Sequence, residues 1–161
     1  MLSQTAEYAL RAVLYLAEQP HGRPVRVDEI GDALGIPANY LSKTLATLVR
    51  SGVLGSLRGP HGGFRLAVAP EDLPLLHVVA PYDDIGTRRH CLLGNPECSD
   101  HGACSAHHAW KETSSHVERF FRTTTVADIR RTGAASATRA RAAATRARTP
   151  KTPPTRTRRS A

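Results

Sequence analysis

Two short helices joined by a glycine turn, and followed at once by a β-hairpin, are the feature that most constrains the fold of this chain. Residues 28–34 and 37–51 carry apolar side chains at helical spacing, and Gly35 lies between them. Directly afterwards, the segments VLGSLR (53–58) and FRLAV (64–68) flank GPHGG, which predicts two short strands joined by a glycine-rich turn. A helix-turn-helix with such a hairpin is a winged helix, whose second helix enters the major groove of DNA.

The second of these helices separates its side chains into two stripes. The core stripe consists of Leu41, Leu45, Leu48 and Val49. The other stripe is polar or small and consists of Asn39, Ser42, Lys43, Ala46 and Arg50. On the hairpin, Arg58, His61 and Arg65 are positioned for contact with phosphates or the minor groove. A polar stripe alone is equally a solvated face, so the prediction of DNA binding depends on the helix pair and the hairpin occurring together.

Further helices complete the expected body. The first covers residues 5–18 and is predicted to bury Ala6, Ala9, Leu10, Val13, Leu14 and Ala17. In the helix pair, Asp28 is expected to cap the first helix and Pro37 to open the second. The first of the pair is predicted to bury Ile30, Ala33 and Leu34, and a short helix at 70–80 to turn Leu73, Leu76, Val79 and Ala80 inward.

A long helix is expected at residues 106–124, with bulky side chains on one face. These are Ala109, Trp110, Thr113, Val117, Phe120 and Phe121. We interpret this face as a dimerisation surface, with a plain core helix as the alternative. Beyond it, residues 131–161 contain no bulky apolar side chain, which predicts a disordered tail. That tail is either a basic arm that holds DNA nonspecifically or a solvated extension without a role.

The three cysteines of the chain, Cys91, Cys98 and Cys104, lie in one short loop, and His107 follows them. In the reducing cytosol such a cluster indicates a metal site more than a disulfide framework. The gaps of six and five residues favour an iron-sulfur cluster over the tighter zinc spacings. His107 is the nearest candidate for a fourth ligand, although His90, His101, His108 and His116 also lie in this region. A structural zinc site and a loop without metal remain alternatives.

The charge distribution and the N-terminal segment limit the possible functions further. The formal net charge is +8, but nine of the 22 basic residues lie in 131–161, so residues 1–130 carry 13 basic and 14 acidic side chains. The first twenty residues lack a basic region and a cleavage site, which predicts a cytoplasmic protein with no role at a membrane. No dinucleotide fingerprint or zinc-protease motif is present, and the hairpin turn lacks the ending of a phosphate-binding loop, so we do not expect an enzyme.

The sequence resembles the Rrf2 family of winged-helix repressors, which includes the iron-sulfur regulator IscR and the nitric-oxide sensor NsrR. The resemblance covers residues 1 to about 130. It is carried by EYALRAVLYLA (7–17), IPANYLSKTLATLVRSGVL (36–54), RGPHGGFRL (58–66), the three cysteines, and HHAW leading into TTTVADI (123–129). Two details differ from the best-known members: the first gap between cysteines is six residues instead of five, and residue 7 is Glu instead of Asp.

The resemblance implies a homodimer on a pseudo-palindromic operator in double-stranded DNA. The helix residues that it implies for base contact are Asn39, Tyr40, Ser42 and Lys43, and the segment from Arg58 through Gly59 to Gly63 forms the wing. It also implies an iron-sulfur cluster on Cys91, Cys98 and Cys104. The fourth ligand is His107 in IscR-like members, and in NsrR-like members it is an acid of the partner's first helix, here Glu7. A 2Fe-2S cluster is favoured over a 4Fe-4S cluster.

The complete prediction is a mainly α protein with four parts. Residues 1–80 form a winged helix-turn-helix domain, 81–106 a cluster-binding loop, 107–130 a dimerisation helix and the end of the folded body, and 131–161 a disordered basic tail. The predicted function is a repressor that senses redox state, nitric oxide or iron-sulfur supply. The alternatives are a winged-helix regulator with a structural zinc or no metal, and an iron-sulfur protein for electron transfer.

Overall fold

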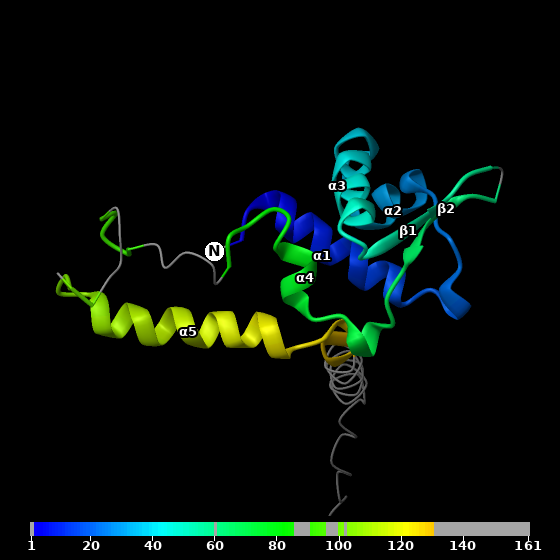
Figure 1. The fold of residues 1–161 in the computed structure, drawn as a ribbon. Helices are drawn as coiled ribbons and strands as arrows, with labels where there is room; N and C mark the ends of the chain where they lie inside the picture. Colours follow the sequence, from blue (N-terminus) through cyan, green and yellow to red (C-terminus); the bar gives the residue numbers. More distant parts are fainter. Residues whose placement is uncertain (1, 60, 86–90, 96–99, 102, 131–161) are drawn as a thin grey trace, which may run out of the picture. The chain divides into compact units, whose positions relative to one another are not determined.

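A computed structural model describes residues 2–59, 61–85, 91–95, 100–101 and 103–130 (Figure 1). The elements are α1 (Gln4–Ala17), η1 (Pro20–Gly22), α2 (Val27–Leu34), α3 (Ala38–Arg50), β1 (Leu54–Leu57), β2 (Gly63–Leu66), η2 (Pro70–Asp72), α4 (Leu75–Val79) and α5 (His107–Thr123). The expected fold class is confirmed: the chain is mainly helical, with one antiparallel two-stranded hairpin after the helix pair and a long C-terminal helix. The chain up to Arg130 is one compact unit, and the predicted tail lies outside the described residues.

Helix α1 begins at a side-chain cap and lies at the centre of the domain. The Ser3 hydroxyl accepts a hydrogen bond from the Ala6 backbone amide at 3.2 Å. The buried residues are Ala6, Ala9, Ala12, Val13, Leu16 and Ala17. Leu10 and Leu14, which were predicted to be buried, are only partly covered. The buried stripe is rotated toward Ala12 and Leu16 because α2, α3, α4 and β2 all pack against this helix.

The helix pair forms as predicted, but α2 begins two residues before the predicted start and Pro37 is displaced by one position. Helix α2 begins at Val27 after Arg26, so Asp28 is not the cap and lies in the first turn. The reason is tertiary: the backbone of Val25 pairs with Phe64 through two hydrogen bonds of 2.9 and 2.8 Å, which fixes where the extended segment ends. Pro37 likewise precedes α3 as its N-cap instead of occupying its first position. Ala33, predicted to be buried, is exposed.

The hairpin is tied to the rest of the domain by the same bridge. Strands β1 and β2 pair in antiparallel register from Leu54 with Leu66 to Leu57 with Gly63. Gly63 has a φ of +154°, and a Cβ atom there would lie 2.5 Å from the Val25 carbonyl oxygen. A side chain at this position would therefore separate the hairpin from the segment that precedes α2.

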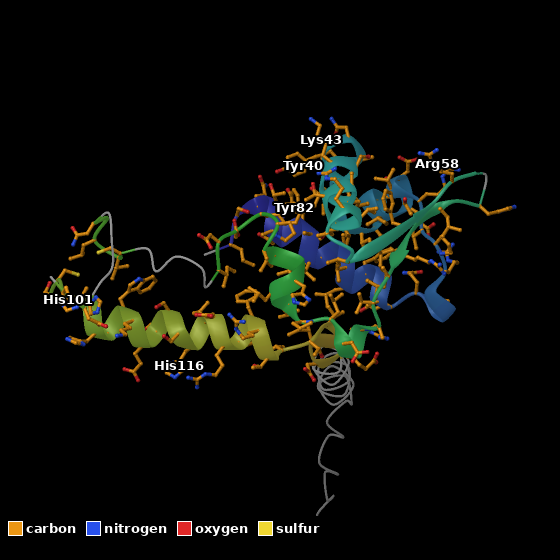
Figure 2. All side chains as sticks on the ribbon, viewed as in Figure 1. Tyr40, Lys43, Arg58, Tyr82, His101 and His116 are labelled. Atoms are coloured by element: carbon orange, nitrogen blue, oxygen red, sulfur yellow. The ribbon has the colours of Figure 1, made fainter. Side chains whose placement is uncertain are left out.

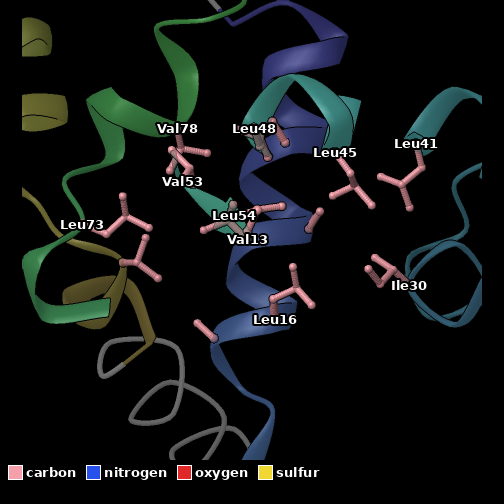
Figure 3. Close-up of a cluster of buried hydrophobic side chains, with 14 of the residues drawn as sticks. Val13, Leu16, Ile30, Leu41, Leu45, Leu48, Val53, Leu54, Leu73 and Val78 are labelled. Atoms are coloured by element: carbon pink, nitrogen blue, oxygen red, sulfur yellow. The ribbon is translucent and has the colours of Figure 1, made fainter. Parts of the chain in front are cut away.

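The apolar core fills the space between α1, the helix pair, the hairpin and α4 (Figure 3). Its largest fully buried side chains are Ile30, Leu41, Leu45, Leu48, Leu73, Val13, Val25, Val78, Val79 and Val126. The helix predicted at 70–80 is interrupted at Pro74, and Ala80 is exposed instead of turned inward. The bend places Leu73 and Leu75 beside the segment that follows α5, where the Val126 amide donates to Leu73 and the Leu75 amide to Thr124, both at 2.9 Å.

Helix α5 is much less covered than the other long helices. Of its 17 residues, His107 alone is buried. The expected apolar face is divided: Trp110 and Phe121 are partly covered, whereas Ala109, Thr113, Val117 and Phe120 are exposed. Within the described part of the chain, none of the helices combines the length and apolar character needed to cross a membrane.

Candidate nucleic-acid interface and metal centre

The predicted DNA-contacting residues lie on α3 and on the hairpin. Asn39, Lys43 and Arg50 are exposed on α3, and Arg58, Gly59, His61 and Arg65 are exposed on the hairpin and its turn. Lys43 and Arg58 extend away from the core in Figure 2, from α3 and from the hairpin respectively.

The basic side chains of this surface are available for an anion. The salt bridges that join described residues involve other side chains, so no carboxylate of the described chain neutralises Lys43, Arg50, Arg58 or Arg65. Arg50 does make one neutral contact, donating to the Thr47 hydroxyl at 2.7 Å. Uncompensated cations on an exposed helix and on the hairpin that follows it carry the charge that phosphate groups attract.

Two of the predicted base-contacting side chains are partly engaged within the chain. Tyr40 is 40% exposed, its hydroxyl lies 2.6 Å from the Thr5 hydroxyl, and its ring packs edge-on against Tyr8 at 5.6 Å. Ser42 is half-buried and donates to the Ala38 carbonyl at 2.7 Å. Tyr40 therefore fastens the start of α3 to α1 as well as presenting part of its ring to solvent. The roles of all these residues toward DNA stay predictions.

Tyr82 connects the segment after α4 to the middle of α3, a contact that the sequence did not reveal. Its hydroxyl donates to the Thr44 carbonyl at 2.6 Å. Tyr82 itself is labelled in Figure 2. Burial raises the pKa of Tyr82 to about 12, against smaller opposing effects of a hydrogen bond with Thr47 and the charge of Arg50. Next to it, the Asp83 carboxylate accepts from the Ser3 amide at 2.7 Å. The start of the predicted cluster-binding loop is thus held against α1 and α3.

Two of the predicted thiol ligands are close together. The Sγ atoms of Cys91 and Cys104 lie 4.0 Å apart, and both are free thiols. Two thiolates on one tetrahedral metal ion, with bonds of about 2.3 Å, lie roughly 3.8 Å apart, so this separation fits ligation of a single metal ion. Cys98 lies outside the described residues. Its position relative to this pair stays a prediction.

The backbone around Cys91 favours the form of the thiol that binds metals. The backbone of Asn95, then that of Leu93, hydrogen-bonds to the sulfur and lowers the pKa of Cys91, and Cys104 adds a smaller effect in the same direction. Metals bind the thiolate and not the thiol. The loop therefore reduces the free energy needed to deprotonate one ligand.

His107 is buried and already has a carboxylate partner. Its side chain is 2% exposed, and Nε2 lies 2.8 Å from Oδ1 of Asp100. Lys111 donates to both oxygens of Asp100 at 2.8 Å, and this hydrogen bond, followed by that of His107, lowers the pKa of Asp100 to about 2. Asp100 and Lys111 were not singled out from the sequence. Lys111 lies one turn after His107 on α5, so both side chains can reach one acid, but this spacing does not identify Asp100 as that acid.

The structure brings together only part of the predicted ligand set. Among the described residues, no three His, Cys, Asp or Glu side chains are gathered closely enough to hold a metal ion, so His107 is not positioned beside the Cys91–Cys104 pair. Glu7, the alternative ligand from a partner subunit, is exposed on α1. His101, His108 and His116 are exposed, and His90 is outside the described residues.

Comparison with known proteins shows one family over nearly all of the described chain. Residues 2–132 match the family model Rrf2, iron-dependent transcriptional regulator. A putative HTH-type transcriptional regulator of Aquifex aeolicus is 36% identical over 131 residues, covering 80% of this chain and 90% of that protein. The HTH-type transcriptional regulator IscR of Vibrio atlanticus is 29% identical over 128 residues, covering 80% of this chain and 73% of that protein.

Solved structures show the same fold at low sequence identity. The global cysteine regulator CymR of B. subtilis aligns with a TM-score of 0.69 at 19% identity, covering 81% of this chain and 95% of that one. IscR of T. potens aligns with a TM-score of 0.67 at 21% identity, covering 83% of this chain and 88% of that one. At such identities the agreement concerns the fold alone.

Proposed function

This chain belongs to the Rrf2 family of transcriptional regulators, and from that premise we propose that it is a dimeric, DNA-binding repressor that senses its signal through an iron-sulfur cluster. The observation that carries the sensing part is the pair of thiols 4.0 Å apart in the loop between α4 and α5. A relative named IscR supports the same assignment. We propose a 2Fe-2S cluster in preference to a 4Fe-4S cluster.

Cys91, Cys98 and Cys104 would hold the cluster, with His107 or Glu7 of the partner subunit as the fourth ligand. When bound, such a cluster supplies a redox-active centre whose potential depends on charge, hydrogen bonds to sulfur and solvent exposure. The thiols lie on a segment that is fastened at one end by Tyr82 to α3 and continues at the other into α5. A change in the conformation of that segment would therefore alter the contact between Tyr82 and α3, the proposed DNA-contacting helix.

The proposed response is a change in the separation of the two α3 helices in a dimer. Half-sites on B-DNA are spaced by the helical repeat, so a small shift of one recognition helix relative to the other weakens binding. Tyr82 and Asp83 hold the loop against α3 and α1, and α4 packs on both α1 and α5. These contacts provide the physical connection between loop and recognition helix that the response needs.

Anaerobic purification followed by absorbance spectroscopy and analysis of iron, sulfide and zinc tests the sensing part. We expect a coloured protein with iron and sulfide in equal amounts, and loss of both in a variant with all three cysteines changed to Ala. Zinc without sulfide would support the alternative of a structural zinc site. A colourless, metal-free protein that still binds its operator would contradict the proposed iron-sulfur sensing and leave the proposed DNA binding intact. A regulator of the same fold, CymR, is named as a cysteine regulator.

DNA binding is tested with operator fragments obtained by in vitro selection. Lys43→Ala and Arg58→Ala remove exposed cations of α3 and the hairpin, and we expect each to weaken operator binding about tenfold or more. Arg119→Ala removes an exposed cation from α5 and is the matched control. Equal affinity in all three variants would place DNA on another surface.

The contribution of residues 131–161 is separable by salt titration. Each phosphate contact adds about 0.9 to the slope of log affinity against log salt. A chain that ends at residue 130 should therefore show a flatter slope than the full chain if the nine basic residues of the tail contact DNA. An unchanged slope would mean that the tail has no role in binding.

A further inference from the structure

A pair of hydroxyl groups joins the first turn of α1 to the first turn of α3. Oγ1 of Thr5 and the hydroxyl oxygen of Tyr40 lie 2.6 Å apart, and either group can be the donor. The Tyr40 ring packs edge-on against Tyr8 with 5.6 Å between the ring centres. The Tyr8 hydroxyl in turn accepts a hydrogen bond from Nε2 of Gln4 at 2.9 Å. Side chains of α1 therefore fix the position of the Tyr40 hydroxyl.

The Thr5–Tyr40 pair retains one proton for a further acceptor. Each hydroxyl has one O–H to donate, and the hydrogen bond between the two groups uses one of their two protons. Whichever group donates to the other, a second O–H is left. Among the described residues, neither hydroxyl has another hydrogen-bond partner. Tyr40 is 40% exposed and Thr5 is half-buried, so an acceptor can approach the pair from solvent.

The charge beside the pair favours an anionic acceptor. Lys43 follows Tyr40 by three residues on α3, a spacing that places two side chains next to each other on the surface of a helix. Lys43 is exposed, and none of the salt bridges between described residues neutralises it. A neutral O–H donor next to a free ammonium group suits a phosphate oxygen, which is charged and accepts hydrogen bonds.

We propose that the Thr5–Tyr40 pair binds one phosphate of the DNA backbone, with Lys43 beside it, so that Tyr40 positions α3 and does not read a base. The inference rests on the proposed DNA binding. It replaces the base contact that the family resemblance implies for Tyr40, because a hydroxyl held by α1 is not free to follow a base edge. It also adds Thr5, a residue of α1, to the DNA-contacting surface.

Phosphate contacts determine the register and orientation of a protein on DNA, whereas base contacts determine which sequence it selects. The pair therefore controls how α3 lies in the groove. The alternative is that the two hydroxyls only fasten α1 to α3. Both roles predict some loss of stability when a hydroxyl is removed, but the phosphate role alone predicts that the loss of DNA affinity depends on one particular phosphate.

The experiment compares the full-length wild type with Thr5→Val, Tyr40→Phe and the double variant, which retain the shape of both side chains. Two variants are matched controls. Thr123→Val removes a hydroxyl that donates to the Arg119 carbonyl within α5 at 2.9 Å, and Tyr15→Phe removes a tyrosine hydroxyl near the other end of α1. Urea denaturation measures the stability of each protein.

DNA affinity is measured on the operator obtained by in vitro selection, and on a series of operators in which each phosphate in turn is replaced by an uncharged methylphosphonate. The selection is then repeated with Tyr40→Phe. Titrations at several salt concentrations distinguish the hydroxyls from the neighbouring cation. A neutral donor does not neutralise a phosphate, so the hydroxyl variants should keep the slope of log affinity against log salt, whereas Lys43→Ala should reduce that slope by about 0.9.

We expect Thr5→Val and Tyr40→Phe each to weaken operator binding about tenfold, because a hydrogen bond to a charged group is lost. The double variant should lose little more than either single variant, since the two hydroxyls act on one phosphate as a unit. One methylphosphonate position in each half-site should weaken binding of the wild type and leave that of the double variant unchanged. Tyr40→Phe should select the same sequence as the wild type, and both controls should bind like the wild type.

Three results would overturn the inference. A selected sequence that changes at one base in Tyr40→Phe would make Tyr40 a base-reading residue. Losses of affinity that are equal on every methylphosphonate operator would reduce the pair to a link between helices. Unchanged affinity in the hydroxyl variants, with weakened binding in Lys43→Ala and Arg58→Ala, would reject the inference alone. If the wild type enriches no DNA sequence at all, the proposed DNA binding fails, and the inference fails with it.

Discussion

The winged-helix part and α5 are built in opposite ways. Buried apolar side chains occur from Ala6 to Val79 and again at Val126 and Ala127, and α5 contributes none of them. Instead α5 buries one polar residue, His107, and leaves Val117 46% and Phe120 49% exposed. The first region is stabilised by its own packing. We infer that the second depends on what it binds, because a helix with so little coverage has little tertiary packing to stabilise it.

The largest effect expected from this contrast is on folding. Leu45→Ala removes a fully buried side chain from the core face of α3 and should lower the free energy of unfolding by about 2–5 kcal/mol. Leu93→Ala makes the same chemical change at a site that is 59% exposed, and it should cost about 0.5 kcal/mol or less. Urea denaturation of both variants measures the difference. Leu93 lies in the loop between α4 and α5, so similar losses would show that this loop is packed as closely as the winged-helix core.

A second test concerns the exposed apolar residues of α5. Phe120→Lys replaces a half-exposed apolar side chain with a charged one, so the free energy of unfolding of the single chain should stay nearly unchanged. If this face forms the proposed dimer interface, the dissociation constant should rise about tenfold or more, because a central apolar contact is replaced by an unpaired charge. Sedimentation equilibrium measures it. Arg122→Ala, on the opposite side of the helix, is the control, and an unchanged constant would move the interface elsewhere.

Tyr82 tests the connection between the loop after α4 and the recognition helix α3. Tyr82→Phe removes the hydroxyl that donates to the Thr44 carbonyl and should cost about 0.5–1.5 kcal/mol of unfolding free energy. It should also reduce the difference in DNA affinity between cluster-loaded and cluster-free protein. Denaturation and DNA titration on the same samples separate the two effects. A stability loss with an unchanged affinity difference would limit Tyr82 to packing.

The same residue has a signature in alkaline solution. The pKa of Tyr82 is raised from 10.0 to about 12 by burial. Between these values the unfolded chain loses the phenolic proton while the folded chain keeps it, so stability should fall as pH rises through this window. The decline should be smaller in Tyr82→Phe than in wild type. Denaturation curves at about pH 9 and about pH 11.5 measure it, and parallel declines in both proteins would contradict the assignment.

The smallest effect is expected at the surface of α5. Arg122 donates to Glu118 one turn earlier at 2.7 Å, and its side chain is 61% exposed. Arg122→Ala should lower the free energy of unfolding by about 0.5 kcal/mol or less, and the loss should shrink further in high salt. A larger, salt-independent loss would show that α5 contributes more to folding than its exposure indicates.

Local patterns predicted most of the architecture. The core stripe of α3 follows from helical spacing, and Leu41, Leu45 and Leu48 are all fully buried. The alternation of the two strands and the glycine turn likewise predicted the hairpin. The prediction of Asp28 as a helix cap was wrong, because the bridge between Val25 and Phe64 sets the start of α2 and joins residues far apart in the sequence.

The sites show the same division. Clustering of the cysteines predicted that Cys91 and Cys104 would be neighbours, since a short loop limits how far apart its ends can be. The hydrogen bonds of Asp100 to His107 and of Tyr82 to Thr44 had no such local signal. Surface acids and tyrosines are common, so residue type alone does not identify their partners: Asp100 and His107 are seven residues apart, whereas Tyr82 and Thr44 are 38 residues apart and meet only in the folded domain. Residue type and spacing thus determined the elements and the candidate ligands, whereas tertiary contacts determined how the loop after α4 is held against α1 and α3, because those contacts join residues far apart in the sequence.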